Sequence, residues 1–188
     1  MRFALLVFSA AALATLAGCS DPVPQSADGA FWLATLQDDP LECKIGGQTA
    51  QVGAIDSTER KTVITDGTNN ASIRCEVEGT TAPFKVHGAI DDLANSATYF
   101  EISIPSITSD ASIDAPAVGS ISFSSSWTAG EPYSGPCNFY FEGTKESVAS
   151  GRIWVSFQCD ALTSNMSTCP LKQGYAIFEN CLTAPIEE

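Results

Sequence analysis

The stretch FKVHGAIDDLANSATYFEISI, residues 84–104, decides the fold class of this chain. Apolar residues take alternate positions on both sides of the polar segment DDLANSA at 91–97, and mostly polar residues fill the positions between them. Successive side chains of a β-strand point to opposite faces, so this alternation predicts two half-buried strands, 84–90 and 100–104, joined by a turn. The sequence therefore predicts a β-hairpin with one buried and one solvated face.

The same pattern of short strands recurs along most of the chain. Turn-rich segments such as DGTNN at 66–70 and AGEPYSGP at 129–136 separate the apolar runs. We therefore expect an all-β fold, an antiparallel β-sandwich or a partly open barrel of about 8–10 short strands stapled by disulfides. The further strand candidates are 41–45, 50–54, 61–65, 72–77, 118–124, 137–142, 152–159 and 174–178.

One apolar run, FWLATL at 31–36, fits two kinds of element. It is either a buried strand or the start of a short helix capped by Asp28, because periodicity does not separate the two at this length. In both cases we expect Phe31 and Trp32 in the core.

Two of the candidate strands, CNFYFE at 137–142 and RIWVSFQC at 152–159, have large apolar residues at odd-numbered positions. An antiparallel pairing can therefore place these residues on one buried face. A slip of one residue would expose the whole set, so we expect a firmly held register. The predicted pairs are Cys137 with Cys159, Phe139 with Phe157, and Phe141 with Val155.

The opposite face of these two strands is the candidate binding face. Tyr140 and Trp154 are diagonal neighbours there, among otherwise polar residues. Two aromatic side chains on a polar strand face are a candidate contact for a ligand or partner. The alternative is that a loop or a second sheet covers both as ordinary core, since large aromatic residues are usually well buried.

The first nineteen residues carry an export signal. Arg2 precedes an apolar run at 3–16 that is too short to span a bilayer, and Leu16-Ala17-Gly18-Cys19 ends it with small residues before a cysteine. This ending resembles the lipobox of bacterial lipoproteins. The resemblance implies cleavage before Cys19, diacylglycerol on its thiol and usually a further acyl chain on the new amino terminus. Ser20 resembles the sorting pattern of outer-membrane lipoproteins. The alternative is an ordinary secretory signal, in which Cys19 is one more cysteine.

The lipoprotein interpretation divides the chain into three parts. Residues 1–18 are the signal peptide, residues 19–29 an acylated flexible tether, and residues 30–188 a single β-sandwich domain. Two or three acyl chains make a stable anchor, so attachment to the membrane requires no transmembrane helix. We therefore expect an exported protein that is lipid-anchored to the bacterial cell envelope, in the outer membrane.

Charge restricts the classes of partner. Removing Arg2 with the signal leaves 8 basic residues against 22 acidic ones, a formal net charge of −14. Nucleic acid is excluded as a partner, because binding it depends on Lys and Arg that displace counterions from phosphates. Anionic lipid head groups would also repel the domain.

Six cysteines remain besides Cys19, and an even number in an oxidising compartment favours three disulfides. A metal site is not expected, because no Cys-x-x-Cys pair occurs and His87 lies far from any close cysteine pair. Hairpin-rich chains bring sequence neighbours together through short loops. The predicted bonds are Cys43–Cys75, Cys137–Cys159 and Cys169–Cys181, with Cys159–Cys169 as a rival.

The sequence contains none of the common catalytic motifs: no Gly-x-Ser-x-Gly, His-Glu-x-x-His, P-loop or Gly-x-Gly-x-x-Gly. His87 falls on the polar face of the first hairpin near Glu101, which favours a solvated histidine over a catalytic base. The loop from Asp66 fails as an EF-hand, because Ala71 and Val77 replace the turn glycine and the bidentate glutamate. We therefore expect no catalytic residue and no cofactor.

Two function classes follow. The first is a non-enzymatic binding or structural module for an unknown protein or glycan partner. The second is a hydrolase that acts on envelope glycan or peptide through paired carboxylates, which are defined by their separation in space rather than by a motif.

Overall fold

A computed structural model describes residues 25–35, 43, 47–55, 61–92, 98–165 and 167–183. Apart from one short 3-10 helix, η1 (Ser126–Thr128), the regular elements of this part are all β-strands. The strands are β1 (Asp28–Thr35), β2 (Thr49–Val52), β3 (Ala54–Ile55), β4 (Lys61–Thr62), β5 (Ile64–Thr65), β6 (Ala71–Glu78), β7 (Phe84–Asp92), β8 (Thr98–Ile107), β9 (Ala117–Ser124), β10 (Tyr133–Tyr140), β11 (Ser147–Ala149), β12 (Arg152–Thr163) and β13 (Thr168–Glu179).

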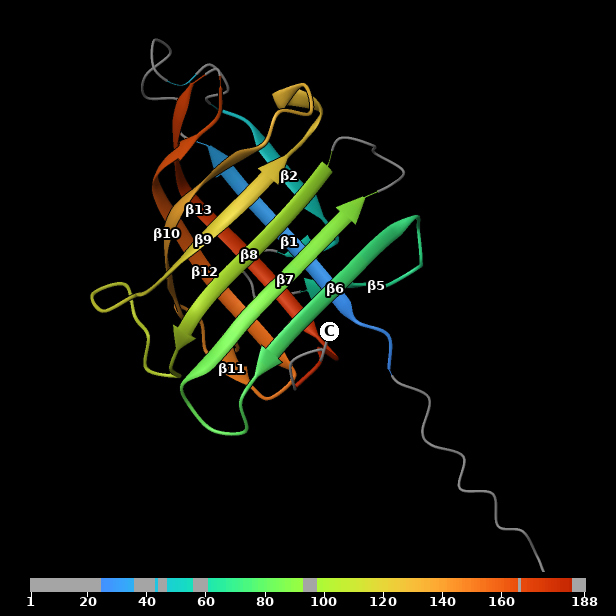
Figure 1. Cartoon of the computed structure of the whole chain (residues 1–188), viewed down its shortest axis with the longest axis vertical. Coiled ribbons are helices and arrows are strands. Elements are labelled where there is room, and N and C mark those ends of the chain that lie inside the picture. Colours follow the sequence, from blue (N-terminus) through green and yellow to red (C-terminus); the bar gives the residue numbers. More distant parts are fainter. Residues whose placement is uncertain are drawn as a thin grey trace, which may run out of the picture.

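One antiparallel sheet contains eleven of these strands. Its order is β2-β1-β13-β12-β10-β9-β8-β7-β6, with β11 added beside β12 and β5 beside β1, while β3 and β4 form a separate hairpin (Figure 1). The all-β antiparallel fold expected from the alternation is confirmed. The first strand begins at Asp28, two residues before the predicted start of the domain.

The hairpin that decided the fold class forms as predicted. β7 and β8 pair antiparallel, with Ile90 opposite Phe100 and Gly88 opposite Ile102. Burial alternates in the first half of β7, where Phe84 and Val86 are buried and Lys85 and His87 are exposed. The run FWLATL is a strand rather than a helix, because residues 31–35 belong to β1. The strand candidate at 41–45 lies outside the described residues except for Cys43.

The sheet curls so that its two halves face each other. In Figure 1 the green and yellow strands β6 to β9 cross in front of β1, β12 and β13. Aromatic side chains fill the space between the halves: the Phe100 ring of β8 lies 4.5 Å from that of Phe31 on β1 and 5.8 Å from that of Phe157 on β12. The main core therefore lies on the concave side of the curled sheet.

The register predicted for β10 and β12 is confirmed over most of its length. Phe139 lies opposite Phe157, and Cys137 forms a disulfide with Cys159. The ladder ends at Tyr140, however, and the amide of Phe141 donates to the carbonyl of Ala111. The predicted pair of Phe141 with Val155 is therefore wrong.

The six cysteines from Cys43 to Cys181 all form disulfides, but two of the predicted pairings are wrong. The observed bonds are Cys43–Cys169, Cys75–Cys181 and Cys137–Cys159. The rival Cys159–Cys169 is not formed either. The physical reason is the curl, which brings the sheet edge at β6 beside the chain after β13, where the Leu182 amide donates to the Cys75 carbonyl. Three disulfides indicate an oxidising compartment outside the cytoplasm.

The candidate strand 50–54 is broken by a glycine. Gly53 has a φ of +71°, a left-handed conformation that ends β2 before β3 begins. A Cβ at this position would lie 2.5 Å from the carbonyl oxygen of Thr62, so no larger side chain fits. This bend carries β3 and its partner β4 out of the main sheet, and β4 supplies Lys61 to the candidate site described next.

Candidate functional site

A second, smaller apolar cluster lies on the convex side of the sheet. Ala30, Trp154 and Ile177, from β1, β12 and β13, are buried there, and Val63 and Tyr175 pack against them. Trp154 lies opposite Ile177 in the ladder. These side chains point away from the main core, so other parts of the chain must shield them from water.

Tyr140 and Trp154 lie on this convex side, as the parity of their strands predicted. The two residues are only 3% and 8% exposed, which agrees with the alternative that other parts of the chain cover them. β11 pairs with β12 and places Ser147 opposite Trp154, while Lys61 Nζ lies 5.9 Å from the centroid of the Trp154 ring. Both aromatic residues are therefore covered rather than exposed on this face.

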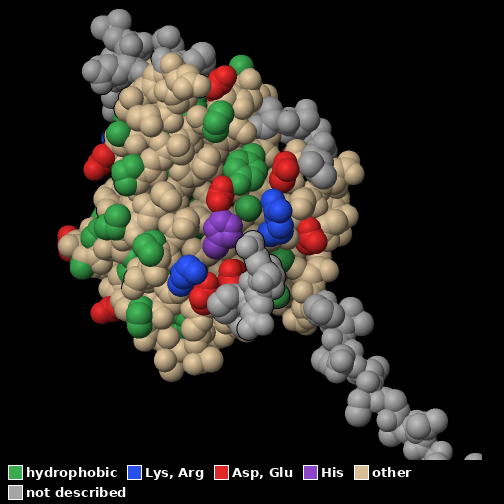
Figure 2. Space-filling view, viewed as in Figure 1, with side chains coloured by type: hydrophobic (Ala, Val, Ile, Leu, Met, Phe, Trp, Pro, Cys, Tyr) green, Lys and Arg blue, Asp and Glu red, His purple; other side chains and the backbone are tan. Residues whose placement is uncertain are grey.

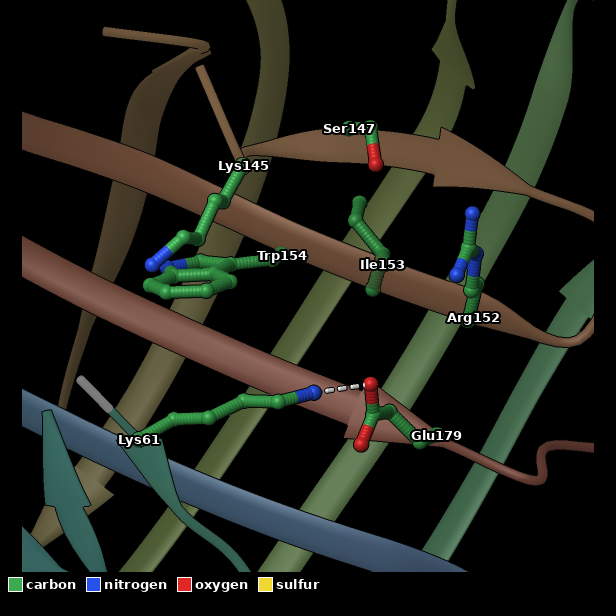
Figure 3. Close-up of a pocket in the computed structure, with 7 residues that line it drawn as sticks. All are labelled: Lys61, Lys145, Ser147, Arg152, Ile153, Trp154 and Glu179. Atoms are coloured by element: carbon green, nitrogen blue, oxygen red, sulfur yellow. Dashed lines mark hydrogen bonds and ion pairs between the residues drawn. The ribbon is translucent and has the colours of Figure 1, made fainter. Parts of the chain in front are cut away.

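A pocket remains open beside the buried Trp154. Its volume is about 170 Å³, and it is formed where β4, the end of β13, β12 and the segment leading into β11 meet (Figure 3). The lining residues are Lys61, Lys145, Ser147, Arg152, Ile153, Trp154 and Glu179. The pocket therefore collects side chains from four places in the sequence.

The pocket is strongly cationic for so acidic a chain. Three of its seven lining residues are basic, and Glu179 is the single acidic one. Lys61 forms an ion pair with Glu179, drawn as a dashed line in Figure 3. If each group has its ordinary charge, the lining carries a formal +2, whereas the whole chain carries −13.

The indole of Trp154 contributes an unsatisfied donor. Its Nε1 is buried and lacks a hydrogen-bond partner in the described structure. In Figure 3 the Lys145 side chain extends toward the indole, whereas the Lys61 side chain is directed to Glu179. A buried N–H donor without an acceptor costs about 1–3 kcal/mol.

A partly buried carboxylate, Glu146, also lies on this convex side, next to β12. Glu146 accepts hydrogen bonds from the Ser156 hydroxyl, at 2.8 Å, and from the Glu142 amide, at 2.7 Å. Burial raises the pKa of Glu146, and the two hydrogen bonds oppose that rise. Burial, together with the nearby carboxylates, also raises the pKa of Tyr140 to about 12. Glu146 thus ties the segment before β11 to β12, which holds Lys145 near the pocket.

A shallower depression lies beside Tyr140. Its volume is about 420 Å³, and its lining contains one acidic side chain, Glu142. Each of the four pockets described in this part of the chain has no more than one acidic residue in its lining. A pair of carboxylates facing each other across a pocket is therefore not found among them.

The remaining residues considered in the sequence lie elsewhere. His87 Nε2 is 3.7 Å from a Glu101 carboxylate oxygen on the outer face of β7 and β8, as the hairpin pattern predicted. Figure 2 shows this face, where the histidine is surrounded by charged side chains of both signs. Asp66 accepts a hydrogen bond from the Ile73 amide, which supports the turn interpretation. Within the described residues, no group of three or more His, Cys, Asp or Glu could hold a metal ion.

Sequence reasoning missed the cationic pocket. Only Arg152 and Trp154 share a local pattern, since both belong to the convex parity of β12. Lys61 and Lys145 are separated by more than eighty positions and reach the pocket through a hairpin and a loop. No sequence signal short of the three-dimensional arrangement links them.

No protein-family model, curated protein or solved structure matches this chain. Among the residues that the structure describes, no helix has the length and apolar character needed to cross a membrane.

Proposed function

We propose that this chain is an exported lipoprotein of the bacterial cell envelope whose folded domain binds a partner without catalysing a reaction. The motif Leu16-Ala17-Gly18-Cys19 supports the lipid anchor, and Ser20 supports sorting to the outer membrane. The three disulfides support a location outside the cytoplasm. The anchor would hold the domain at the membrane surface through the tether at residues 19–29.

The observation that carries the binding role is the cationic pocket beside Trp154. Its lining joins three basic side chains, from β4, from β12 and from the segment before β11, with the Trp154 indole. Binding sites commonly combine a concave apolar floor with a few placed polar groups. The unknown partner, a protein or a glycan, would contact the domain here.

The alternative of a carboxylate-dependent hydrolase has less support. Paired acids in glycosidases flank an open pocket at separations of about 5–9 Å. Glu146 is the carboxyl group whose pKa burial raises, but both of its oxygen atoms accept hydrogen bonds from the chain itself. It therefore serves the structure of its own loop.

The anchor is tested by metabolic labelling with a palmitate analogue. We expect the wild-type protein to incorporate label and to sediment with membranes, and Cys19→Ser to lose both properties. Ser20→Ala, one residue further along, is the matched control and should keep the label. Undiminished label on the Cys19→Ser protein would contradict the lipoprotein assignment.

The binding role is tested by photo-crosslinking in intact cells. A photoreactive residue at Ser147 lies on the pocket, and one at Ser122 lies on the opposite outer face of the sheet. We expect adducts from position 147 that disappear when Lys145→Gln and Arg152→Gln are added, and none of these adducts from position 122. Equal adduct patterns from the two positions would refute the pocket as the binding site.

A further inference from the structure

We infer that the depression beside Tyr140, on the convex side of the sheet, binds a short neutral oligosaccharide. This is a second site, because it shares no lining residue with the pocket beside Trp154. The inference rests on a β-bulge that brings polar side chains to the depression, on a lining without net charge, and on a half-buried aromatic pair next to it.

A β-bulge in β13 places two consecutive polar side chains at the depression. Lys172 and Gln173 together oppose Gln158 of β12, where a regular ladder would have one residue on each strand. The ladder with β1 is irregular at the same place, because Ala34 pairs with Gln173, the next residue of β1 pairs with Leu171, and Lys172 is left out. Lys172 and Gln173 are therefore both exposed, although the alternation of a regular strand would turn one of them to the core.

The lining combines hydrogen-bond donors with acceptors. Gln158 and Gln173 each carry an amide that has both kinds of group, Lys172 donates, and the Glu142 carboxylate accepts. Neither Gln158 nor Lys172 makes a hydrogen bond or ion pair within the described residues, so both side chains are available to a ligand. A sugar hydroxyl both donates and accepts, and a saccharide can therefore pair with each of these groups.

The formal charges of the lining cancel. Lys172 is its single basic residue and Glu142 its single acidic one, whereas the whole chain carries a formal −13. An anionic ligand would find no local excess of positive charge and would be repelled by the rest of the domain. A cationic ligand would lie beside the Lys172 ammonium. A neutral ligand meets neither opposition.

An aromatic pair extends the depression along the strands. Trp32 and Tyr175 are opposite each other in the ladder of β1 and β13, their ring centroids lie 5.7 Å apart, and both are half-buried. The pair of Ala34 with Gln173, which lines the depression, lies two residues further along the two strands and therefore on the same face. Gln173 also donates a hydrogen bond to the Tyr175 hydroxyl. The apolar faces of sugar rings pack on such side chains while their hydroxyl groups reach polar neighbours.

The Glu142 carboxylate connects the depression with this aromatic pair. Burial, and after it the negative charge of Glu142, raises the pKa of Tyr175 and raises that of Tyr140 to about 12. One carboxylate thus acts on phenols from two different strands, and both phenols keep their protons as donors at neutral pH. The ladder agrees, since Tyr140 and Tyr175 both lie opposite Ser156 of the strand between them.

The test is NMR titration of the purified full chain with three neutral trisaccharides, namely cellotriose, maltotriose and chitotriose. We expect saturable binding of at least one of them and a shift of the Trp32 indole resonance, which is assigned by its loss in Trp32→Phe. The galacturonic acid trimer should bind at least about tenfold more weakly, because its carboxylates meet the negative domain.

Paired variants locate the site. Gln158→Ala with Gln173→Ala should weaken trisaccharide binding by at least about tenfold, since each change removes an amide from the lining. The matched control is Ser122→Ala with Ser134→Ala, which removes two hydrogen-bonding side chains from the depression on the outer face of β9 and β10. That pair should change the affinity by less than about twofold.

Four results would overturn the proposal. They are the absence of saturable binding by all three trisaccharides, equal or tighter binding of the galacturonic acid trimer, an equal loss of affinity in the two variant pairs, and a shift of the Trp154 indole resonance without one of Trp32. The last result would place the sugar in the pocket beside Trp154. Crosslinking from Ser147 reports on that pocket independently, so failure of one site leaves the test of the other intact.

Discussion

The two faces of strand β12 are buried by different means. On the concave face Ile153, Val155 and Phe157 are no more than 1% exposed and pack against strands from the other half of the sheet. On the convex face Trp154 lies beside the three-residue strand β11, and the Lys61 ammonium lies 5.9 Å from the centroid of its ring. Sheet packing against sheet closes the first face completely, whereas short segments leave the second with a pocket. The concave face therefore holds the fold, and the convex face carries the pocket that we propose as the binding site.

The disulfides test how far the concave face depends on contacts between distant parts of the chain. The pair Cys75→Ser and Cys181→Ser opens a link across 106 residues, and we expect it to lower the free energy of unfolding by about 3–5 kcal/mol. Cys43–Cys169 stays closed, which shortens the effective loop, yet that loop still exceeds the 22 residues of Cys137–Cys159. Removing Cys137–Cys159 should therefore cost less. Urea unfolding of the two double variants measures both losses of free energy. A larger loss on removal of Cys137–Cys159 would contradict this account.

Truncation on each side of β12 compares the faces directly. Phe157→Ala should lower the free energy of unfolding by about 3–5 kcal/mol, because it leaves a cavity beside the Phe100 and Phe139 rings that water cannot enter. Trp154→Ala should cost less despite its larger side chain, since water from the adjacent pocket can enter the vacated volume. The measurement is the urea midpoint at equal slope. A larger loss for Trp154→Ala would make the convex cluster the dominant core.

The sequence predicts the concave face well, because the alternation of apolar and polar residues identifies the side chains that are buried there. Ile90, Phe100 and Phe157 are all fully buried where the period of two placed them. For the convex cluster, the sequence predicts which face of the sheet its side chains lie on, but not whether other segments cover them. Whether Trp154 is covered depends on Lys61, which reaches it through the bend at Gly53, and on a three-residue strand that has too few residues to show a period. Two of the three predicted disulfide pairings are wrong for the same reason, because curling joins ends of the chain that no local pattern relates.

The next largest loss of stability is expected where two strands approach each other closely within the concave core. A Cβ at Gly174 would lie 2.3 Å from the Phe157 ring, so Gly174→Ala should cost about 1–3 kcal/mol through overpacking. Phe157→Leu removes most of the ring, and the double variant should therefore lose less than the sum of the two single losses. A double-mutant cycle in urea measures this coupling. Additive losses would mean that β13 shifts to make room.

The smallest effect concerns Glu146, which holds the segment that carries Lys145. Burial raises the pKa of its carboxyl above the ordinary value of 4.5, so the folded state binds this proton more tightly than the unfolded state does. The stability gained from that proton is complete below the ordinary pKa and is lost as the pH rises through the raised one. Between these two values the wild-type urea midpoint should therefore fall more steeply with pH than that of Glu146→Gln. Glu131→Gln removes an equal charge from another loop and should keep the wild-type slope. Identical slopes in all three proteins would show that the hydrogen bonds from Ser156 and the Glu142 amide fully offset the burial, leaving Glu146 a tie without a pH response.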